Sequence, residues 1–314
     1  MNKIIILLAT YNGEKYIQEQ LEPLLIQTYN EFQILVHDDN STDDTLQLLQ
    51  KYAKNFPDKV MLLDDNISNG GAKENFIYLL NQVDKEYDYI MFCDQDDVWE
   101  KDKIEKTLAK MQELEFQYED TPLLVHTDLK VVDEELKLIQ NSFWKHEYIN
   151  PSINSFNRLL MQNTITGCTV MINRKLAELC LPVPDGAIMH DWWIGLVASK
   201  FGKIGFINDS TILYRQHASN SIGAKGFSYL SVLMKFYKLF SNNELYLKHL
   251  KINIIQAKAF LDIYREILDE GTIEMLEEFS TLESKSFLEK RKILLKHKLL
   301  KQGLIRNLGL LLKI

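Results

Sequence analysis

The sequence predicts an α/β fold in which a mostly parallel sheet is flanked by helices and followed by a helical appendage. Short apolar runs alternate with helical patterns along the first 130 residues, and this alternation is typical of right-handed crossovers between parallel strands. From Phe227 onward the pattern is helical only and is dense in Leu, Ile and Lys. The chain has 314 residues, of which 46% are apolar, and this is enough for one large core with a smaller appendage.

The predicted elements follow one another in a regular order. Strands are expected at residues 4–8, 33–37, 60–63, 89–93 and 123–126, with helices between them at about 15–27, 41–53, 73–83 and 102–115. Further strands are expected at 165–172 and 204–214, with a helix at about 191–200 between them. A boundary near Gly223–Phe227 then separates a sheet-containing domain (1–224) from a helical, basic region (225–314).

Composition and charge exclude several classes of function. Residues 285–314 hold nine Lys or Arg and one Glu, so they carry a charge of +8, whereas residues 1–284 carry −16. An acidic body disfavours nucleic-acid binding, and a basic tail favours an anionic partner. The three cysteines lie far apart and suit a reducing compartment.

Targeting and membrane signals are also weak in this sequence. The apolar run at 4–9 is too short for a secretion signal, and no stretch approaches the roughly 20 apolar residues that span a bilayer. We therefore expect a cytoplasmic protein, or one that is peripheral on the inner face of the cell membrane.

Polar side chains follow the predicted strands at the points where the strands end. Because parallel strands end at one edge of a sheet, these groups are expected to converge there. Clustered carboxylates repel one another, and a divalent cation with oxygen ligands, Mg²⁺ or Mn²⁺, resolves the conflict. Asp94 and Asp96 have the alternate spacing that points two side chains at one ligand. The acidic residues concerned are Asp38, Asp39, Asp94, Asp96, Asp97 and Asp128.

Helix capping is the alternative interpretation of some of these acids. Asp after a strand is common because it caps helices and forms turns, and this explanation is equally compatible with Asp38 and Asp39. Other nucleotide sites are excluded by their missing motifs: the sequence has no GxGxxG after its first strand, no GxxxxGK[ST] loop and no GxSxG elbow.

Six segments together resemble the inverting family-2 glycosyltransferases, which have the GT-A nucleotide-diphospho-sugar transferase fold. The segments are ATYNGEKYIQEQLEPLLIQTY, ILVHDDNSTDDT, NGGAKENF, YIMFCDQDDVWEKDKI, TGCTVMINR and HDWW. The resemblance covers residues 1 to about 217. Within the family, CDQDDVW, TDLKVVDEEL and YRQHASNSIGAK are similar to segments of bacterial rhamnosyltransferases of cell-wall and capsular polysaccharide synthesis.

The resemblance implies roles for individual residues on the donor side. Metal ligation falls to Asp96 and Asp94, with His217 as a further candidate whose alternative is a structural role. The cofactor implied is Mn²⁺ or Mg²⁺. The residues expected to bind the donor nucleotide are Thr10, Tyr11, Asn12, Asp39, Asn69, Lys73 and Asp94.

On the acceptor side the resemblance implies that Asp191 is the catalytic base, and the alternative is that it caps the following helix. Trp192, Trp193, His190 and Asp128 are expected near the acceptor sugar, although core packing is equally compatible with one of the two tryptophans. His190 stands where relatives often have Glu.

The implied function is transfer of a sugar from a nucleotide-sugar to a saccharide acceptor that is carried on a lipid. L-rhamnose from dTDP-rhamnose is the expected donor, with UDP-hexose or UDP-N-acetylhexosamine as the alternative. A non-catalytic nucleotide-sugar-binding partner is the alternative from another class. A sugar nucleotidyltransferase would require a Gly-rich, basic loop, which the segment Thr10–Glu14 lacks.

The basic tail has two interpretations. Residues 282–312 mix Leu and Ile with Lys, and such a helix can lie on an anionic membrane surface. The alternative is packing on the main domain or on a second subunit of a homodimer.

Overall fold

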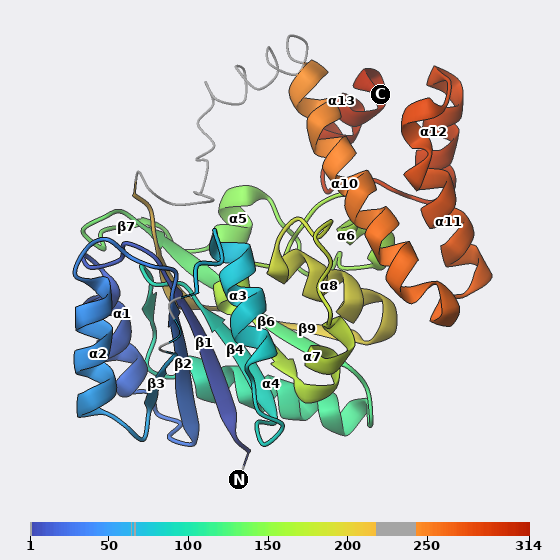
Figure 1. Cartoon of the computed structure of the whole chain (residues 1–314). Helices are drawn as coiled ribbons and strands as arrows, with labels where there is room; N and C mark the ends of the chain where they lie inside the picture. The colour runs from blue at the N-terminus through green and yellow to red at the C-terminus, as the bar shows by residue number, and fades with distance from the viewer. Residues whose placement is uncertain (1, 64, 66, 218–242) are drawn as a thin grey trace.

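The protein is described here from a computed structural model, which covers residues 2–63, 65, 67–217 and 243–314. The boundary predicted near Gly223–Phe227 lies outside these residues. Figure 1 shows a sheet covered by helices on both faces, with the C-terminal helices beside it.

The strands pair in the order β3-β2-β1-β4-β8-β6-β9-β5, and β7 pairs with the C-terminal end of β6. Their bounds are β1 (Ile4–Thr10), β2 (Phe32–Asp38), β3 (Val60–Leu62), β4 (Tyr89–Cys93), β5 (Val98–Trp99), β6 (Leu123–Val132), β7 (Leu138–Gln140), β8 (Met171–Asn173) and β9 (Lys203–Arg215). The helices of the sheet-containing part are α1 (Ile17–Leu25), α2 (Thr45–Asn55), α3 (Ala72–Asn81), α4 (Lys103–Gln117), α5 (Phe143–Glu147), α6 (Phe156–Leu159), α7 (Arg174–Cys180) and α8 (His190–Phe201).

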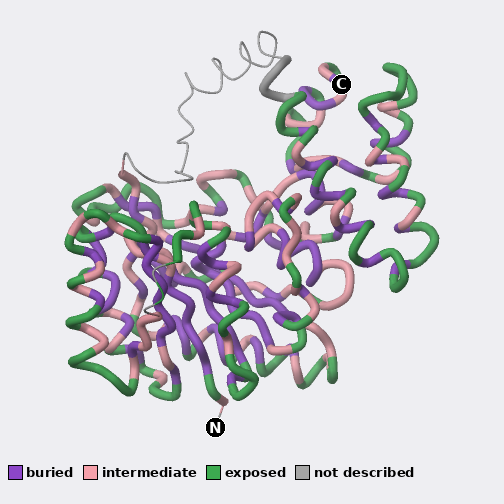
Figure 2. Tube along the Cα trace, viewed as in Figure 1, coloured by how far each residue is buried: buried purple, intermediate pink, exposed green. Residues whose placement is uncertain are grey.

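Alternate side chains of each central strand enter cores on opposite faces of the sheet. In β1, Ile5 and Leu7 pack into the core under α3 and α8, whereas Ile4, Ile6 and Leu8 pack into the core under α1 and α4. This two-sided burial explains why the strand is a continuous apolar run rather than an alternating one. Figure 2 shows the central strands as buried along most of their length.

The sheet is less parallel than the sequence predicts. β1, β2, β3 and β4 are parallel, but β8 lies antiparallel between β4 and β6. The strand expected at 165–172 is wrong over most of its length, because a 3₁₀ turn (Gly167–Thr169) precedes the short β8. Since two antiparallel pairings restore direction, β6 runs the same way as β4, and the strand ends still reach one edge.

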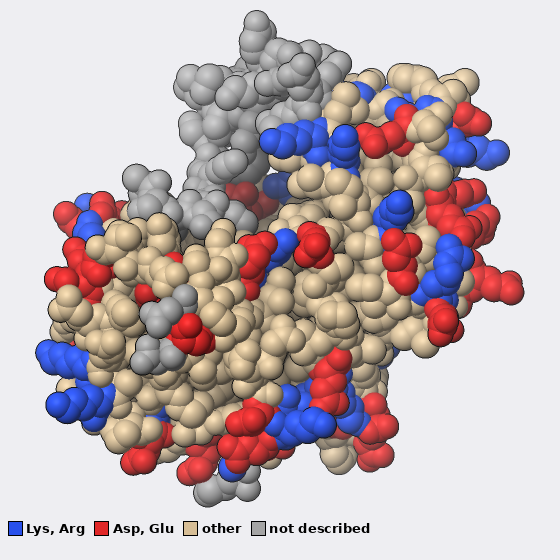
Figure 3. Space-filling view, viewed as in Figure 1, with Lys and Arg blue, Asp and Glu red and all other residues tan. Residues whose placement is uncertain are grey.

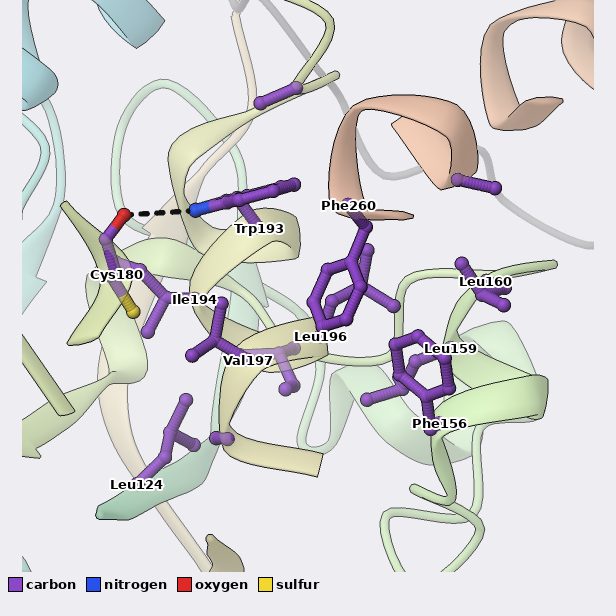
Figure 4. Close-up of a cluster of buried hydrophobic side chains, with 14 of the residues drawn as sticks. Leu124, Phe156, Leu159, Leu160, Cys180, Trp193, Ile194, Leu196, Val197 and Phe260 are labelled. Atoms are coloured by element: carbon purple, nitrogen blue, oxygen red, sulfur yellow. Dashed lines mark hydrogen bonds between the residues drawn. The ribbon is translucent and has the colours of Figure 1, made fainter. Parts of the chain in front are cut away.

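The C-terminal region folds into α10 (Asn243–Tyr264), α11 (Glu270–Ser280), α12 (Phe287–Lys296) and α13 (Leu304–Lys313). Phe260 and Tyr264 of α10 pack on the indole of Trp193 in α8, with ring centroids 5.5 and 5.9 Å away. Figure 4 shows Phe260 beside Trp193, whose indole N–H donates to the carbonyl oxygen of Cys180. α10 therefore belongs to the same core as the sheet. Leu294 and Leu310 of the basic tail are buried in that core too, as the interpretation of packing on the main domain predicts.

None of the helices in the described ranges combines the length and apolar character that crossing a bilayer requires.

Candidate functional site

A cleft of about 1110 Å³ opens at the carboxyl edge of the strands. Four aspartates line it, namely Asp39 after β2, Asp94 and Asp96 after β4, and Asp191 in α8. Of the six strand-end carboxylates that were expected to converge, Asp39, Asp94 and Asp96 line this cleft, whereas Asp38, Asp97 and Asp128 do not.

The turn after β1 forms one wall of this cleft. The Tyr11 side chain is 55% exposed and faces the opening. Thr10 is buried and donates its hydroxyl to the Asp38 carboxylate (2.9 Å), and the Asn12 side chain accepts the Thr42 N–H (2.8 Å). Thr10 and Asn12 also line the cleft, but these hydrogen bonds use their side chains to hold the wall in place.

Gln95 is a site residue that the sequence analysis missed. The Tyr11 N–H donates to its amide oxygen (2.8 Å), and its amide nitrogen donates to the Tyr11 carbonyl oxygen (2.9 Å). These two hydrogen bonds hold the loop that carries Asp94 and Asp96 against the end of β1. The contact joins positions 84 residues apart, and only the place of Gln95 between two acids could have drawn attention to it.

Asp39 holds the neighbouring loop through backbone hydrogen bonds. Its carboxylate accepts the N–H groups of Asn69, Gly70 and Gly71. Gly70 has φ +82°, a left-handed conformation that favours glycine. The loop and Asp39 therefore form one unit on the cleft wall.

Asn69 and Lys73 do not line the cleft in this structure. The Asn69 amide lies 3.4 Å from the ring nitrogen Nδ1 of His37. The Lys73 ammonium pairs with Glu74 (3.0 Å) and donates to the carbonyl oxygen of Ala187 (3.3 Å). Lys73 thus connects α3 to the segment that leads into α8.

Asp94, the first acid after β4, lies in an environment that disfavours its ionised form. Burial, together with the charges of Asp96 and Asp191, raises the pKa of Asp94 to about 7. The ring nitrogen Nε2 of His217 lies 2.8 Å from a carboxylate oxygen of Asp96, so the structure places this candidate ligand beside the predicted one.

These residues fit a divalent cation by their donor chemistry. Asp94, Asp96 and His217 present oxygen and nitrogen donors to the cleft, and the excess negative charge between them favours a bound cation. A second group, formed by Asp94, Asp97 and Cys168, has donor atoms within 4.8 Å of one another. It fits a hard cation less well, because Asp97 and Cys168 are buried and burial raises the pKa of the thiol.

Arg215 supports this loop from beneath. Its guanidinium forms an ion pair with Glu19 and donates to the carbonyl oxygens of Asp96 (2.9 Å) and Glu134 (2.6 Å). Its backbone N–H donates to Asp97 (3.1 Å), and its side chain is 2% exposed. Asp97 and Arg215 therefore position the loop rather than face the cleft.

Replacement of Arg215 by Lys should lower the free energy of unfolding by about 2–4 kcal/mol, because one ammonium cannot satisfy the buried acceptors that the forked guanidinium reaches. Chemical denaturation measures this loss. Arg265→Lys is the matched control, since Arg265 also pairs with a glutamate but is half exposed. Equal stability of the two variants would contradict the role assigned to Arg215.

Asp191 lies in the first turn of α8, where its carboxylate accepts the Trp192 N–H (2.6 Å). The N-cap position belongs to Met189, so the capping alternative for Asp191 is wrong. Burial raises the pKa of Asp191 to about 6, although hydrogen bonds from neighbouring groups oppose the shift. At neutral pH the group is ionised, yet it is a stronger base than an ordinary aspartate.

The residues beside Asp191 divide between cleft and core. Trp192 lines the cleft, and its indole N–H donates to the Leu159 carbonyl oxygen (2.6 Å). Trp193 is fully buried in the core. His190 lines the cleft and packs against Phe76, with ring centroids 4.2 Å apart and the ring planes tilted by 36°. Burial lowers the pKa of His190 to about 3, so its ring is neutral.

Asp128 is not part of the cleft. β6 continues to Val132 instead of ending near His126, and Asp128 lies within it at 3% exposure. Its carboxylate accepts the hydroxyl of Ser142 and the N–H of Trp144 (3.1 Å) at the start of α5. Its position matches capping rather than acceptor contact.

Several known proteins are similar to this chain in sequence, and two of them are informative. The dTDP-rhamnosyl transferase RfbG of Shigella flexneri is 31% identical over 224 residues, which cover 69% of this chain and 74% of that protein. The poly(ribitol-phosphate) beta-N-acetylglucosaminyltransferase TarS of Staphylococcus aureus is 36% identical over 115 residues. These cover 36% of this chain and 19% of TarS, so the match spans about a fifth of that relative.

Many solved structures share the fold, among them the following two. S. aureus TarS 1-349 in complex with UDP-GlcNAc has a TM-score of 0.58 at 19% identity, covering 94% of this chain and 79% of that one. The mannosyltransferase PcManGT of Pyrobaculum calidifontis, in complex with GDP-Man and Mn2+, has a TM-score of 0.53 at 14% identity, covering 98% and 87%. The predicted GT-A fold, with helices after the sheet, is confirmed.

The model of the family described as Glycosyl transferase family 2 matches residues 5–179, more than half of the chain. With the cleft geometry and the similarity to RfbG, this match confirms the resemblance found in the sequence. The chain belongs to glycosyl transferase family 2.

Proposed function

We propose that this glycosyltransferase transfers L-rhamnose from dTDP-rhamnose to a saccharide acceptor, with inversion at the anomeric carbon. The observation that carries the proposal is the placement of Asp39, Asp94 and Asp96 in the same cleft as Asp191. The donor is chosen because the relative RfbG, which matches over most of both chains, is named a dTDP-rhamnosyl transferase. The acceptor is proposed to be lipid-linked and to belong to bacterial cell-wall or capsular polysaccharide.

In the proposed reaction Asp191 is the general base. Its carboxylate takes the proton of an acceptor hydroxyl, whose oxygen attacks the anomeric carbon as the bond to the diphosphate breaks. One displacement leaves the opposite configuration at that carbon, and the nucleoside diphosphate departs with the bonding electrons. The partly buried Trp192 offers a flat apolar face for the acceptor ring.

On the donor side, Tyr11 and Asp39 are proposed to bind the nucleotide base and Asp94 to lie near the ribose. A divalent cation held by Asp96, beside Asp94 and His217, would neutralise charge that develops on the leaving diphosphate. Arg215 and Gln95 keep the Asp96 loop in place through the backbone. Because this loop is already held in place, less free energy is needed to rearrange its charged groups as the sugar is transferred.

A second donor class remains a candidate because TarS, named an N-acetylglucosaminyltransferase, is 36% identical over 115 residues. The purified chain is therefore tested with Mn²⁺ and a panel of dTDP-rhamnose, UDP-glucose, UDP-galactose and UDP-N-acetylglucosamine, with release of the nucleoside diphosphate as the readout. We expect dTDP-rhamnose to give a kcat/KM at least about tenfold higher than the others.

The panel distinguishes the alternatives. Preference for a UDP-sugar would replace the rhamnosyl proposal by hexosyl or N-acetylhexosaminyl transfer. Binding of dTDP-rhamnose in calorimetry without turnover of any donor, even with saccharide acceptors present, would favour a non-catalytic binding partner.

A further inference from the structure

The helix α13 presents an aliphatic face to solvent. Leu304, Ile305, Leu308 and Leu312 are 77, 47, 52 and 65% exposed. At 3.6 residues per turn these four side chains fall within an arc of about 100° that contains no polar residue. We call them the aliphatic stripe. The opposite side of the helix is anchored in the core by Leu310, so the stripe is held outward by packing.

The preceding helix α12 adds apolar surface of the same kind. Phe287, Leu288 and Leu295 are 60, 75 and 55% exposed. The Arg291 guanidinium donates to the carbonyl oxygen of Phe287 (2.6 Å) and to that of the C-terminal Ile314. Arg291 thus joins α12 to the end of α13, so that the two helices form one unit.

Basic charge gathers in the same part of the chain. Residues 285–314 carry +8 and the remainder −16. Lys285, Lys292 and Lys298 are exposed and form no ion pair with any described residue. α11 holds four of the ten acids of residues 243–314, and its Glu274 pairs with Lys296 of α12 (2.7 Å). Figure 3 shows basic and acidic side chains together on the side of the appendage that faces the viewer. The excess of basic charge is therefore a property of residues 285–314 and not of that whole side.

We propose that α12 and α13 bind the surface of a lipid bilayer that contains anionic lipids. A bilayer surface offers an apolar layer for the aliphatic stripe and a negative headgroup layer for the lysines. Contiguous apolar side chains on the surface of a soluble domain mark an interaction site. The acidic remainder of the chain is repelled by the same headgroups, so the charge asymmetry fixes which side of the molecule faces the bilayer.

This surface lies next to the cleft. Arg306, about 150° around α13 from the centre of the stripe, lines the cleft and donates to the Glu147 carbonyl oxygen (2.8 Å). One helix, about 10 Å across, therefore separates the cleft from the lipid-facing side. If the proposed function holds, an acceptor carried on a lipid is presented at this end of the cleft.

The test is sedimentation of the full chain, without donor or acceptor, with vesicles of phosphatidylcholine alone or of equal parts phosphatidylcholine and phosphatidylglycerol. We expect binding to the anionic vesicles only. The double variant Leu308→Asp/Leu312→Asp should bind at least about tenfold more weakly, because it loses apolar burial and gains like charge. Lys285→Glu/Lys292→Glu should also weaken binding and reduce its dependence on salt.

The control is Phe116→Asp, which places a single aspartate at a 91% exposed apolar residue of α4 and should bind as the unchanged protein does. Circular dichroism melting verifies that each variant is folded. Equal binding by the double variant, or no binding by the unchanged protein, overturns the proposal. If light scattering showed a dimer that the double variant cannot form, and no protein bound vesicles, the aliphatic stripe would instead bind a second copy of the chain. Since no substrate is used, failure of the donor panel leaves this result unaffected.

Discussion

Asp191→Asn should reduce sugar transfer by about 10²–10⁴-fold and at the same time stabilise the protein. Transfer falls because an amide cannot take the proton of the acceptor hydroxyl. Stability rises because burial raises the pKa of this carboxyl to about 6, so its ionised form is disfavoured in the folded state. Asparagine imitates the neutral form, and we expect a gain of about 1–2 kcal/mol at pH 8 after discounting for partial exposure.

The sign of the pH dependence follows from the same shift. A carboxyl whose folded pKa is raised contributes most stability below its unfolded pKa, and this contribution is lost as the pH rises through about 6. The advantage of the variant should therefore be full at pH 8, shrink as the pH falls from about 6 to about 4, and be absent below about pH 4. In the unchanged enzyme kcat/KM should fall about tenfold per pH unit below pH 6.

Asp185→Asn is the matched control for this prediction, because Asp185 is an exposed acid in the segment leading into α8. It should leave both transfer and melting temperature unchanged. A flat profile of kcat/KM between pH 5 and 8, or near-normal transfer by Asp191→Asn, would remove Asp191 from the role of base.

Asp96→Asn should abolish the metal-dependent part of donor binding and lower kcat/KM by at least about 10²-fold. The amide retains one oxygen but loses the negative charge that attracts a divalent cation, while the contact with His217 can persist as a neutral hydrogen bond. Calorimetry with dTDP, with and without Mn²⁺, measures the binding. For the unchanged enzyme we expect tighter binding with Mn²⁺, and for the variant we expect no difference.

The control for Asp96 is Asp102→Asn, which neutralises a surface acid paired with Lys106 near the start of α4. It should keep the response to Mn²⁺. Full turnover of the unchanged enzyme in excess chelator would show that the cleft works without a metal ion.

The strand-end acids could be predicted from sequence because the argument needs only the direction of strands. β1, β2 and β4 are parallel neighbours, so Asp39, Asp94 and Asp96 reach one edge, and the antiparallel β8 lies beyond β4. Asp191 could be placed only through the family resemblance, since no periodic pattern connects it to that edge.

The supporting contacts could not be predicted because they join distant parts of the chain. Arg215 and Glu19 are 196 residues apart, and nothing in the local pattern of either residue indicates the other. Asp128 was misplaced because the strand carrying it extends past a bulge, which a run of apolar residues does not reveal.

The error at 165–172 has a steric explanation. A Cβ atom at Gly167 would lie 2.9 Å from the Nε2 atom of His190, so the backbone approaches α8 more closely than a regular strand would. Apolar composition alone does not distinguish such a turn from a strand.

The stacking of α10 on Trp193 limits how this enzyme can be recombined with its relatives. Exchange of C-terminal regions at the end of β9 would pair a foreign helix with the Trp193 surface, which Phe260 and Tyr264 now fill. Hybrid proteins that are joined after Tyr264 keep the contact of Phe260 and Tyr264 with Trp193 and exchange only α11 to α13. Exchange of the proposed membrane-binding helices is therefore easiest at that junction. Donor preference is expected to change through other residues, those proposed to bind the nucleotide-sugar.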